Sequence, residues 1–133
     1  MLNPFPSLLV YGFFTPTLLR VAVAIYFVYI AQFLAREEKK LEAIRVPLVG
    51  QMRAWMVWLS VVVTTLVAFC LFVGYETQWA AIVGMLISLK HLYGTRKYAS
   101  YLPLSRGTYI LLFIICLSLL YSGAGAMAFD LPL

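Results

Sequence analysis

Charged residues are scarce in four long apolar stretches of this chain, and no other feature constrains its fold as strongly. The stretches cover about residues 16–34, 54–73, 78–93 and 108–127, and the short segments between them hold nearly every Lys and Arg. A helix that crosses the hydrocarbon core of a bilayer needs about 20 predominantly apolar residues, and somewhat fewer if it is recessed. The pattern therefore predicts an all-α integral membrane four-helix bundle with antiparallel neighbouring spans.

The overall composition agrees with a membrane environment. Of the 133 residues, 64% are hydrophobic and 11% are charged, whereas soluble domains carry about 25% charged residues. There are too few polar side chains to cover a soluble core of this size. Because four spans consume most of the length, we expect residues 1–133 to form a single transmembrane domain.

Nine of the ten basic residues fall in two connecting segments, which predicts the orientation of the protein in the membrane. The segment 35–53 contains Arg36, Lys39, Lys40, Arg45 and Arg53, and the segment 90–106 contains Lys90, Arg96, Lys97 and Arg106. Short connections rich in Lys and Arg stay in the cytoplasm, so we expect a multi-pass protein of the cell membrane with both termini outside the cytoplasm. We assign the net charge of +5 to topology and lipid headgroups. Nucleic-acid binding is not expected, because there is no extended basic face.

Local signals predict where two of the helices begin and end. Thr15 is a candidate N-cap for a helix that starts at Pro16, because proline is tolerated in the first helical turn. Residues 35–46 contain good helix formers and no breaker before Pro47. We therefore expect the first helix to continue as a charged extension beyond the membrane, and a dedicated site for a partner protein is the alternative. Lys90, near the end of the third span, is expected to extend outward toward water.

Three charges on the opposite side of the membrane are candidates for an ion-pair network. Arg20 lies about one turn into the first span, Glu76 lies in the turn after the second, and Asp130 follows the fourth. An ion close to hydrocarbon is costly unless it is paired or reaches water. We expect Arg20 to pair with Asp130 or Glu76, and separate contact of each side chain with water is the alternative.

Four uncharged polar side chains within the spans are candidates for a pocket. These are Tyr26, Tyr29 and Gln32 in the first span and Tyr121 in the fourth. Their side chains could hydrogen-bond between helices or line a small pocket for a quinone-like molecule. The sequence does not separate these two roles.

No residue pattern indicates a metal site or a catalytic constellation. His91 is the only histidine and has no Cys or carboxylate close to it in sequence, so packing at the membrane interface is favoured over metal ligation. Cys70 and Cys116 have no metal-type spacing and are expected to pack as small apolar residues. A disulfide or redox dithiol would require the second and fourth spans to touch at these positions. Without a hydrolytic triad, a phosphate loop or paired acids, a catalytic role is left open and a chain that is not catalytic by itself is favoured.

Small residues recur at helical spacing in three of the spans. They are Ser60, Thr64 and Ala68, then Ala80, Gly84 and Ser88, then Ser118, Ser122 and Ala126. Small residues let helices approach closely in lipid, so we expect the three stripes to face one another inside the bundle. Homo-oligomerisation through one of them is the alternative.

Three stretches of the chain resemble the DoxX family of small four-helix membrane proteins. The stretch 18–21 is similar to that family's opening pattern, with an Arg early in the first helix, and the stretch 71–81 resembles its turn between helices 2 and 3. The stretch 123–130 is similar to its closing pattern, a Gly-x-Gly run followed by a small residue, an apolar residue and Asp. The residues that match this closing pattern are Gly123, Gly125 and Asp130.

The resemblance implies a four-helix fold and a role in a membrane complex. It implies that some relatives are membrane subunits of sulfur- or thiol-oxidising complexes that pass electrons to quinone, or assemble redox-protective enzymes at the membrane. We expect a non-catalytic membrane subunit or anchor for a partner at the cytoplasmic face, surrounded by membrane lipids and without a cofactor. The alternative is a small membrane subunit of a quinone-linked redox complex.

Overall fold

The protein is built almost entirely from helices. The structure, a computed structural model, describes residues 12, 14–42, 45–46, 50–51, 54–97 and 102–123. These residues form the helices α1 (Thr15–Arg36), α2 (Glu38–Glu42), α3 (Ala54–Val73), α4 (Thr77–Lys97) and α5 (Arg106–Ser122). Two short strands, β1 (Arg45–Val46) and β2 (Gly50–Gln51), pair in antiparallel fashion, with Arg45 opposite Gln51 and Val46 opposite Gly50.

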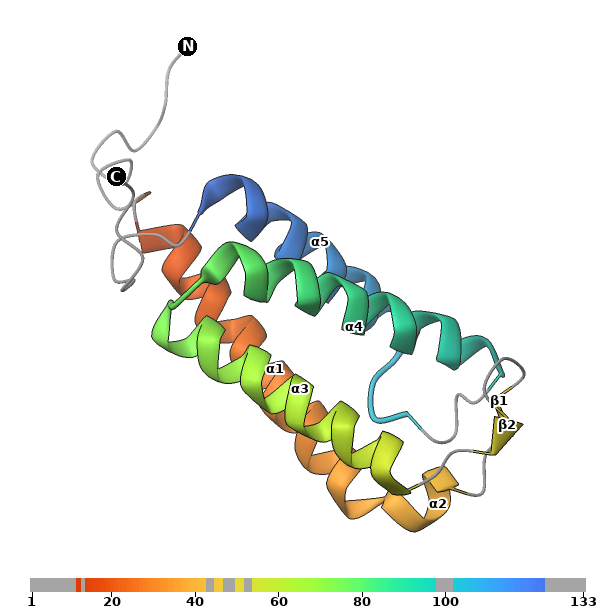
Figure 1. The fold of residues 1–133 in the computed structure, drawn as a ribbon. Coiled ribbons are helices and arrows are strands. Elements are labelled where there is room, and N and C mark those ends of the chain that lie inside the picture. The colour runs from red at the N-terminus through yellow and green to blue at the C-terminus, as the bar shows by residue number, and fades with distance from the viewer. Residues whose placement is uncertain are drawn as a thin grey trace.

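The four long helices lie side by side in two closely packed pairs (Figure 1). Helix α1 packs mainly against α3, and α4 packs mainly against α5, while the contacts of α3 with α4 and of α1 with α5 join the pairs. The three-residue turn 74–76 makes α3 and α4 antiparallel neighbours, as its short length predicts. Gly74, with φ of 78°, ends α3 in the left-handed region that glycine enters without strain.

The described charged residues are concentrated toward one end of the molecule. The end of α1, all of α2, both strands, the start of α3 and the end of α4 lie at this end (Figure 1). The start of α1, the 74–76 turn and the end of α5 lie at the other end. Among the described residues, only Arg20 and Glu76 place a charge in that second half. We call the first end the basic end.

The interior is filled by an apolar stripe from each helix of the two pairs. On α1 the buried positions Val23, Phe27, Ile30 and Leu34 recur every three or four residues, which puts them on one helical face. The other faces carry large apolar side chains that are exposed, such as Leu18 at 71% exposure. Within the described part of the chain, α1 and α3 are long and apolar enough to cross a membrane.

The expected charged extension of α1 is wrong, because the helix stops at Arg36 and the chain turns. Glu37 leaves the helical conformation with ψ of 19°, and its N–H donates to the carbonyl of Phe33 at 3.0 Å. The Glu37 carbonyl then accepts from the N–H groups of Lys40 and Leu41, which begins α2. The turn lets Leu41, only 7% exposed, join the apolar core. A helix that continued straight would instead carry Leu41 beyond the start of α3.

Four further helix boundaries differ from the sequence prediction. Helix α1 begins at Thr15 with Phe14 as N-cap, so Thr15 is not the cap. Helix α4 continues through Gly94 to Lys97, and a Cβ atom on Gly94 would lie 3.3 Å from Leu102 of the following loop. Helix α5 starts after the N-cap Ser105, whose Oγ accepts from the N–H of Thr108, and ends five residues early because Gly123 adopts φ of 75°.

Candidate functional site

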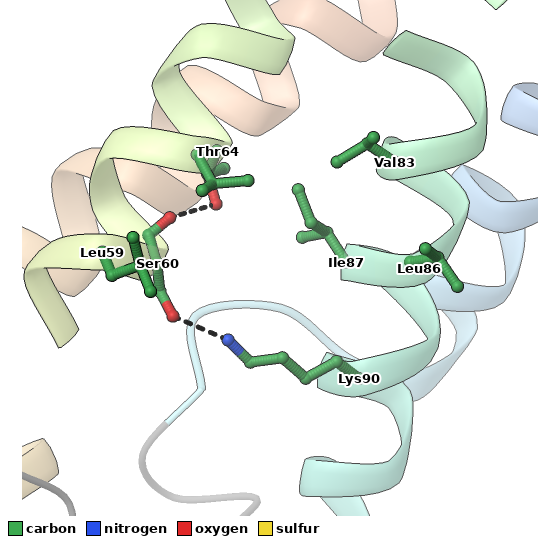
Figure 2. Close-up of a pocket in the computed structure, with 8 residues that line it drawn as sticks. Leu59, Ser60, Thr64, Val83, Leu86, Ile87 and Lys90 are labelled. Atoms are coloured by element: carbon green, nitrogen blue, oxygen red, sulfur yellow. Dashed lines mark hydrogen bonds between the residues drawn. The ribbon is translucent and has the colours of Figure 1, made fainter. Parts of the chain in front are cut away.

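A cleft of about 290 Å³ opens between α3 and α4 toward the basic end (Figure 2). It exists because the two helices contact each other less extensively than either contacts its own partner, α1 or α5. Its walls are apolar, and the side chains of α3 and α4 face each other across it. The apolar lining residues are Leu59 and Val63 on α3 and Val83, Leu86 and Ile87 on α4.

One cation crosses the cleft. The ammonium of Lys90 on α4 donates a hydrogen bond to the hydroxyl of Ser60 on α3, with an Nζ–Oγ distance of 2.8 Å (Figure 2). Beside it, the hydroxyl of Thr64 donates to the carbonyl of Ser60 one turn earlier, at 2.7 Å. The sequence predicts that Lys90 extends outward; in the structure Lys90 is exposed, and its hydrogen bond to Ser60 also joins α4 to α3 at the mouth of the cleft.

A second hollow, of about 630 Å³, adjoins the cleft on the outer side of α4. It is lined by Leu86 and Lys90, which also line the cleft, and by Tyr93 and Arg96 nearer the helix end. Two basic side chains therefore border one hollow at the basic end. Sequence reasoning grouped both residues only as part of the basic segment 90–106 and did not predict that they border one hollow.

A buried polar pair connects α4 and α5. His91 is 4% exposed and its ring stacks on that of Tyr109, which is fully buried, with centroids 5.4 Å apart and an interplanar angle of 13°. The Nδ1 atom of His91 lies 2.8 Å from the carbonyl oxygen of Ile87, and because a carbonyl can only accept, Nδ1 must carry the proton. His91 therefore packs between two helices, and its expected position at the membrane interface stays a prediction. Within the described residues no cluster of His, Cys, Asp or Glu is arranged to hold a metal ion.

Sequence reasoning missed Tyr109, although the sequence contains a signal for it. The buried residues of α5 are Tyr109, Leu112, Cys116 and Leu119, spaced alternately by three and four residues. That spacing is typical of the inward face of a packed helix. Because the exposed side of α5 is apolar as well, with Ile110, Leu111 and Ile114, this spacing agrees with an inward Tyr109 but does not by itself select that face.

The three residues of the expected ion-pair network lie at the end opposite the basic end or beyond the described part. Arg20 is buried on α1, with 2% of its surface exposed. Glu76 is exposed in the turn between α3 and α4 and has φ of 48°. Asp130 lies outside the described residues. The pairing of Arg20 with one of these carboxylates stays a prediction.

The four residues of the expected pocket have exposed side chains. Tyr26 and Tyr29 are 44% and 49% exposed on the outer side of α1, where Gln32 is exposed as well. Tyr121 is 86% exposed near the end of α5. None of these residues lines the cleft or the adjoining hollow. Quinone binding at them stays a prediction.

The remaining sequence candidates take structural positions. Gly123 is the C-cap of α5, while Gly125, like Asp130, lies outside the described residues. Cys116 is buried in the core, Cys70 is half-buried, and both are free thiols. They occupy helices α5 and α3, and the structure assigns them no disulfide.

Helix α2 forms a charged surface at the basic end, and two contacts hold this helix in place. The indole N–H of Trp58 on α3 donates to Glu38 Oε1 at 2.8 Å, and Leu41 packs into the core. Lys39 and Lys40 remain exposed, and Lys40 forms an ion pair with Glu37 at 2.6 Å. We call residues 37–42 the α2 surface.

These groups offer features that suit binding. The cleft offers apolar walls and a cation with hydroxyl neighbours, a combination that accommodates an apolar chain and an anion. The α2 surface offers charges of both signs on a docked helix. Comparisons of the chain with protein-family models, with curated proteins and with solved structures find no match in any of the three.

Proposed function

We propose that this chain is a DoxX-like integral membrane protein that crosses the bilayer four times. In this proposal it is a non-catalytic membrane subunit that anchors a partner protein at the cytoplasmic face. The residues of the α2 surface are the proposed contact for that partner.

The single observation that carries the proposal is the apolar outer surface of the long helices, which surrounds an interior that is itself mostly apolar. Large apolar side chains on the outside are exposed, for example Phe69 at 65%, Leu86 at 62% and Leu111 at 54%. Polar groups such as Thr64 and Ser88 are 1% exposed in the interior. In water each exposed apolar Å² costs about 25 cal/mol relative to burial, whereas in lipid the same surface is solvated.

The buried share of the two most apolar helices supports the same conclusion. The core helix of a soluble protein is apolar because it is mostly buried. In α1 and α3, only 39% and 33% of the residues in the apolar window are buried. Most residues in these windows are therefore at least partly exposed, as expected for helices that contact lipid.

Aromatic residues at both ends support a bilayer-sized apolar band. Trp55 is 60% exposed near the start of α3 and Tyr75 is 59% exposed just after its end. The 20 residues of α3 correspond to about 30 Å at 1.5 Å per residue, close to the thickness of the hydrocarbon core. Trp and Tyr are enriched where a membrane protein meets the headgroups.

The concentration of Lys and Arg at the basic end supports a cytoplasmic location for that end. Both termini then lie on the other side of the membrane. The α2 surface is the best-defined folded element outside the proposed lipid band, because its short helix is docked by Trp58 and Leu41. A partner that binds the protein from the cytoplasm would therefore meet it first.

The quinone-linked redox role has less support. It requires a pocket around Tyr26, Tyr29 and Tyr121, and these side chains lie on the outer surface. A lipid-facing tyrosine is equally consistent with a position at the headgroups.

The anchor proposal is tested by purifying the tagged chain from native membranes with its bound proteins. We expect one soluble protein to copurify in a constant ratio, and to be lost from the double variant Lys39→Glu/Lys40→Glu, which reverses two exposed charges. The matched control is Arg96→Glu, a charge reversal at the same end on α4, which should retain the partner. Equal capture by all three chains, or no protein in constant ratio, would contradict the proposal.

A further inference from the structure

We propose that the cleft between α3 and α4, together with the adjoining hollow on α4, binds one anionic phospholipid. The phosphate lies at Lys90 and Arg96, and an acyl chain enters the cleft. The inference rests on the proposed membrane location, because such a lipid reaches the site from the bilayer. It adds a specific ligand site that the anchor role does not require.

The first observation is the pair of cations around one hollow. Lys90 and Arg96 both line it, together with Tyr93, and its other lining residues are leucines, so among the described residues that line the hollow none is a carboxylate. The ammonium of Lys90 has three donors and gives one to Ser60. Two donors remain for phosphate oxygens, and the exposed guanidinium of Arg96 adds a planar set of donors.

The second observation is the apolar cleft that opens directly beside the cations. Leu86 and Lys90 belong to both the hollow and the cleft, so the place for the headgroup and the place for the chain are continuous. Figure 2 shows Val83 and Ile87 on α4 directed toward α3, while Leu86 lies on the outer side of α4. A free phosphate would use only the cations, whereas a phospholipid uses both parts of the site.

The third observation is the depth of the site. Lys90 lies seven residues before the end of α4, which is about 10 Å along the helix axis. A lysine at that depth reaches the headgroup phosphates with its ammonium while its stem stays in the apolar layer. The exposed indoles of Trp55 and Trp58 at the same end mark the headgroup level. Basic pockets between helices on the cytoplasmic side suit anionic headgroups.

The test is native mass spectrometry of the whole purified chain in detergent, titrated with phosphatidylglycerol or with phosphatidylcholine. We expect phosphatidylglycerol to bind the wild-type chain at a concentration about tenfold lower than phosphatidylcholine does, because its headgroup accepts charge-assisted hydrogen bonds. In Lys90→Gln/Arg96→Gln that preference should disappear, while binding of phosphatidylcholine stays the same. Arg96→Gln alone, a change at an exposed side chain, should weaken phosphatidylglycerol binding without unfolding the protein.

Two matched controls distinguish binding at this site from a general effect of positive charge and from a general effect of a larger side chain. Arg36→Gln/Lys39→Gln removes two cations at the same end but outside the hollow, and should leave the preference intact. Leu86→Trp fills the point shared by cleft and hollow and should weaken binding of the lipid. Leu111→Trp adds the same bulk on the exposed side of α5 and should not.

Three results would overturn the lipid site. The first is equal retention of the two lipids by the wild-type chain. The second is an equal loss of phosphatidylglycerol binding in the Lys90/Arg96 and Arg36/Lys39 variants. The third is displacement of the lipid by inorganic phosphate, together with lipid binding that does not change in Leu86→Trp. The last result would assign the cations to a free phosphate. Because none of these measurements involves the partner protein or the topology, they can fail while the anchor role stands. Loss of the partner or of the four-span topology would instead remove the anchor role.

Discussion

Gly84 shows how closely the two helix pairs approach each other. A Cβ atom at this position on α4 would lie 3.0 Å from Cε2 of Phe27 on α1 and 3.2 Å from Sγ of Cys116 on α5. Both neighbours are fully buried, so neither has room to move away. The absence of a side chain at one residue therefore lets three helices meet.

We expect Gly84→Ala to lower the free energy of unfolding by about 1–3 kcal/mol, the usual cost of overpacking a filled core. Thermal unfolding of the purified chain in detergent measures the change. The control is Gly107→Ala, where the nearest atom would be Ser105 Oγ at 3.8 Å and alanine is the better helix former. The close approach would be refuted if Gly84→Ala were as stable as the wild-type chain.

The small-residue stripes expected to face one another are largely buried on α4 and α3 but not on α5, where Ala126 lies outside the described residues. Ala80, Gly84 and Ser88 on α4 are buried, as are Thr64 and Ala68 on α3. On α5 the small residues Ser118 and Ser122 are exposed, and larger residues face inward instead. Beside Gly84 the space is filled by the ring of Phe27 on α1 and by the thiol of Cys116 on α5.

At the scale of the elements, α2 is the part of the fold that sequence reasoning placed least well. Its residues were expected to continue α1 in a straight line. In the structure a turn at Glu37 brings Leu41 into the core and Glu38 to Trp58. Helix propensity favours continuation, but it does not report contacts with a helix that comes later in the chain.

We expect Trp58→Phe to weaken the docking of α2 by about 1 kcal/mol, because phenylalanine keeps an aromatic ring but removes the N–H donor. Hydrogen–deuterium exchange should then become faster in residues 38–42 and stay unchanged within α3. Trp55→Phe changes an exposed indole on the same helix and serves as the control. Equal exchange in both variants would show that the hydrogen bond to Glu38 does not hold α2.

For the whole molecule, the decisive property is the separation of charge along the helix axes. The proposed orientation predicts opposite accessibility for the two ends. In a background with Cys70→Ala and Cys116→Ala, a membrane-impermeant maleimide should label Tyr75→Cys in intact cells. It should label Lys40→Cys only after lysis, because the basic end faces the cytoplasm. Labelling of both positions from the same side would contradict the four-span topology.

The sequence by itself determined where the four long helices lie, to within about five residues at each end. It also determined that the described charges are separated between the two ends, because the connections are short and consecutive helices reverse direction. The short turn at Gly74 was sufficient to make α3 and α4 antiparallel neighbours. These features follow from local composition and chain length.

Only the tertiary structure decided which face of each helix points inward. Tyr26 and Tyr29 were expected to be able to line a pocket but have exposed side chains, while Tyr109 and His91 are buried against each other. When a helix is apolar on every side, the period of the sequence carries little information about its rotation. Packing against neighbours sets that rotation, and it alone brought Lys90 to Ser60 across a cleft between α3 and α4.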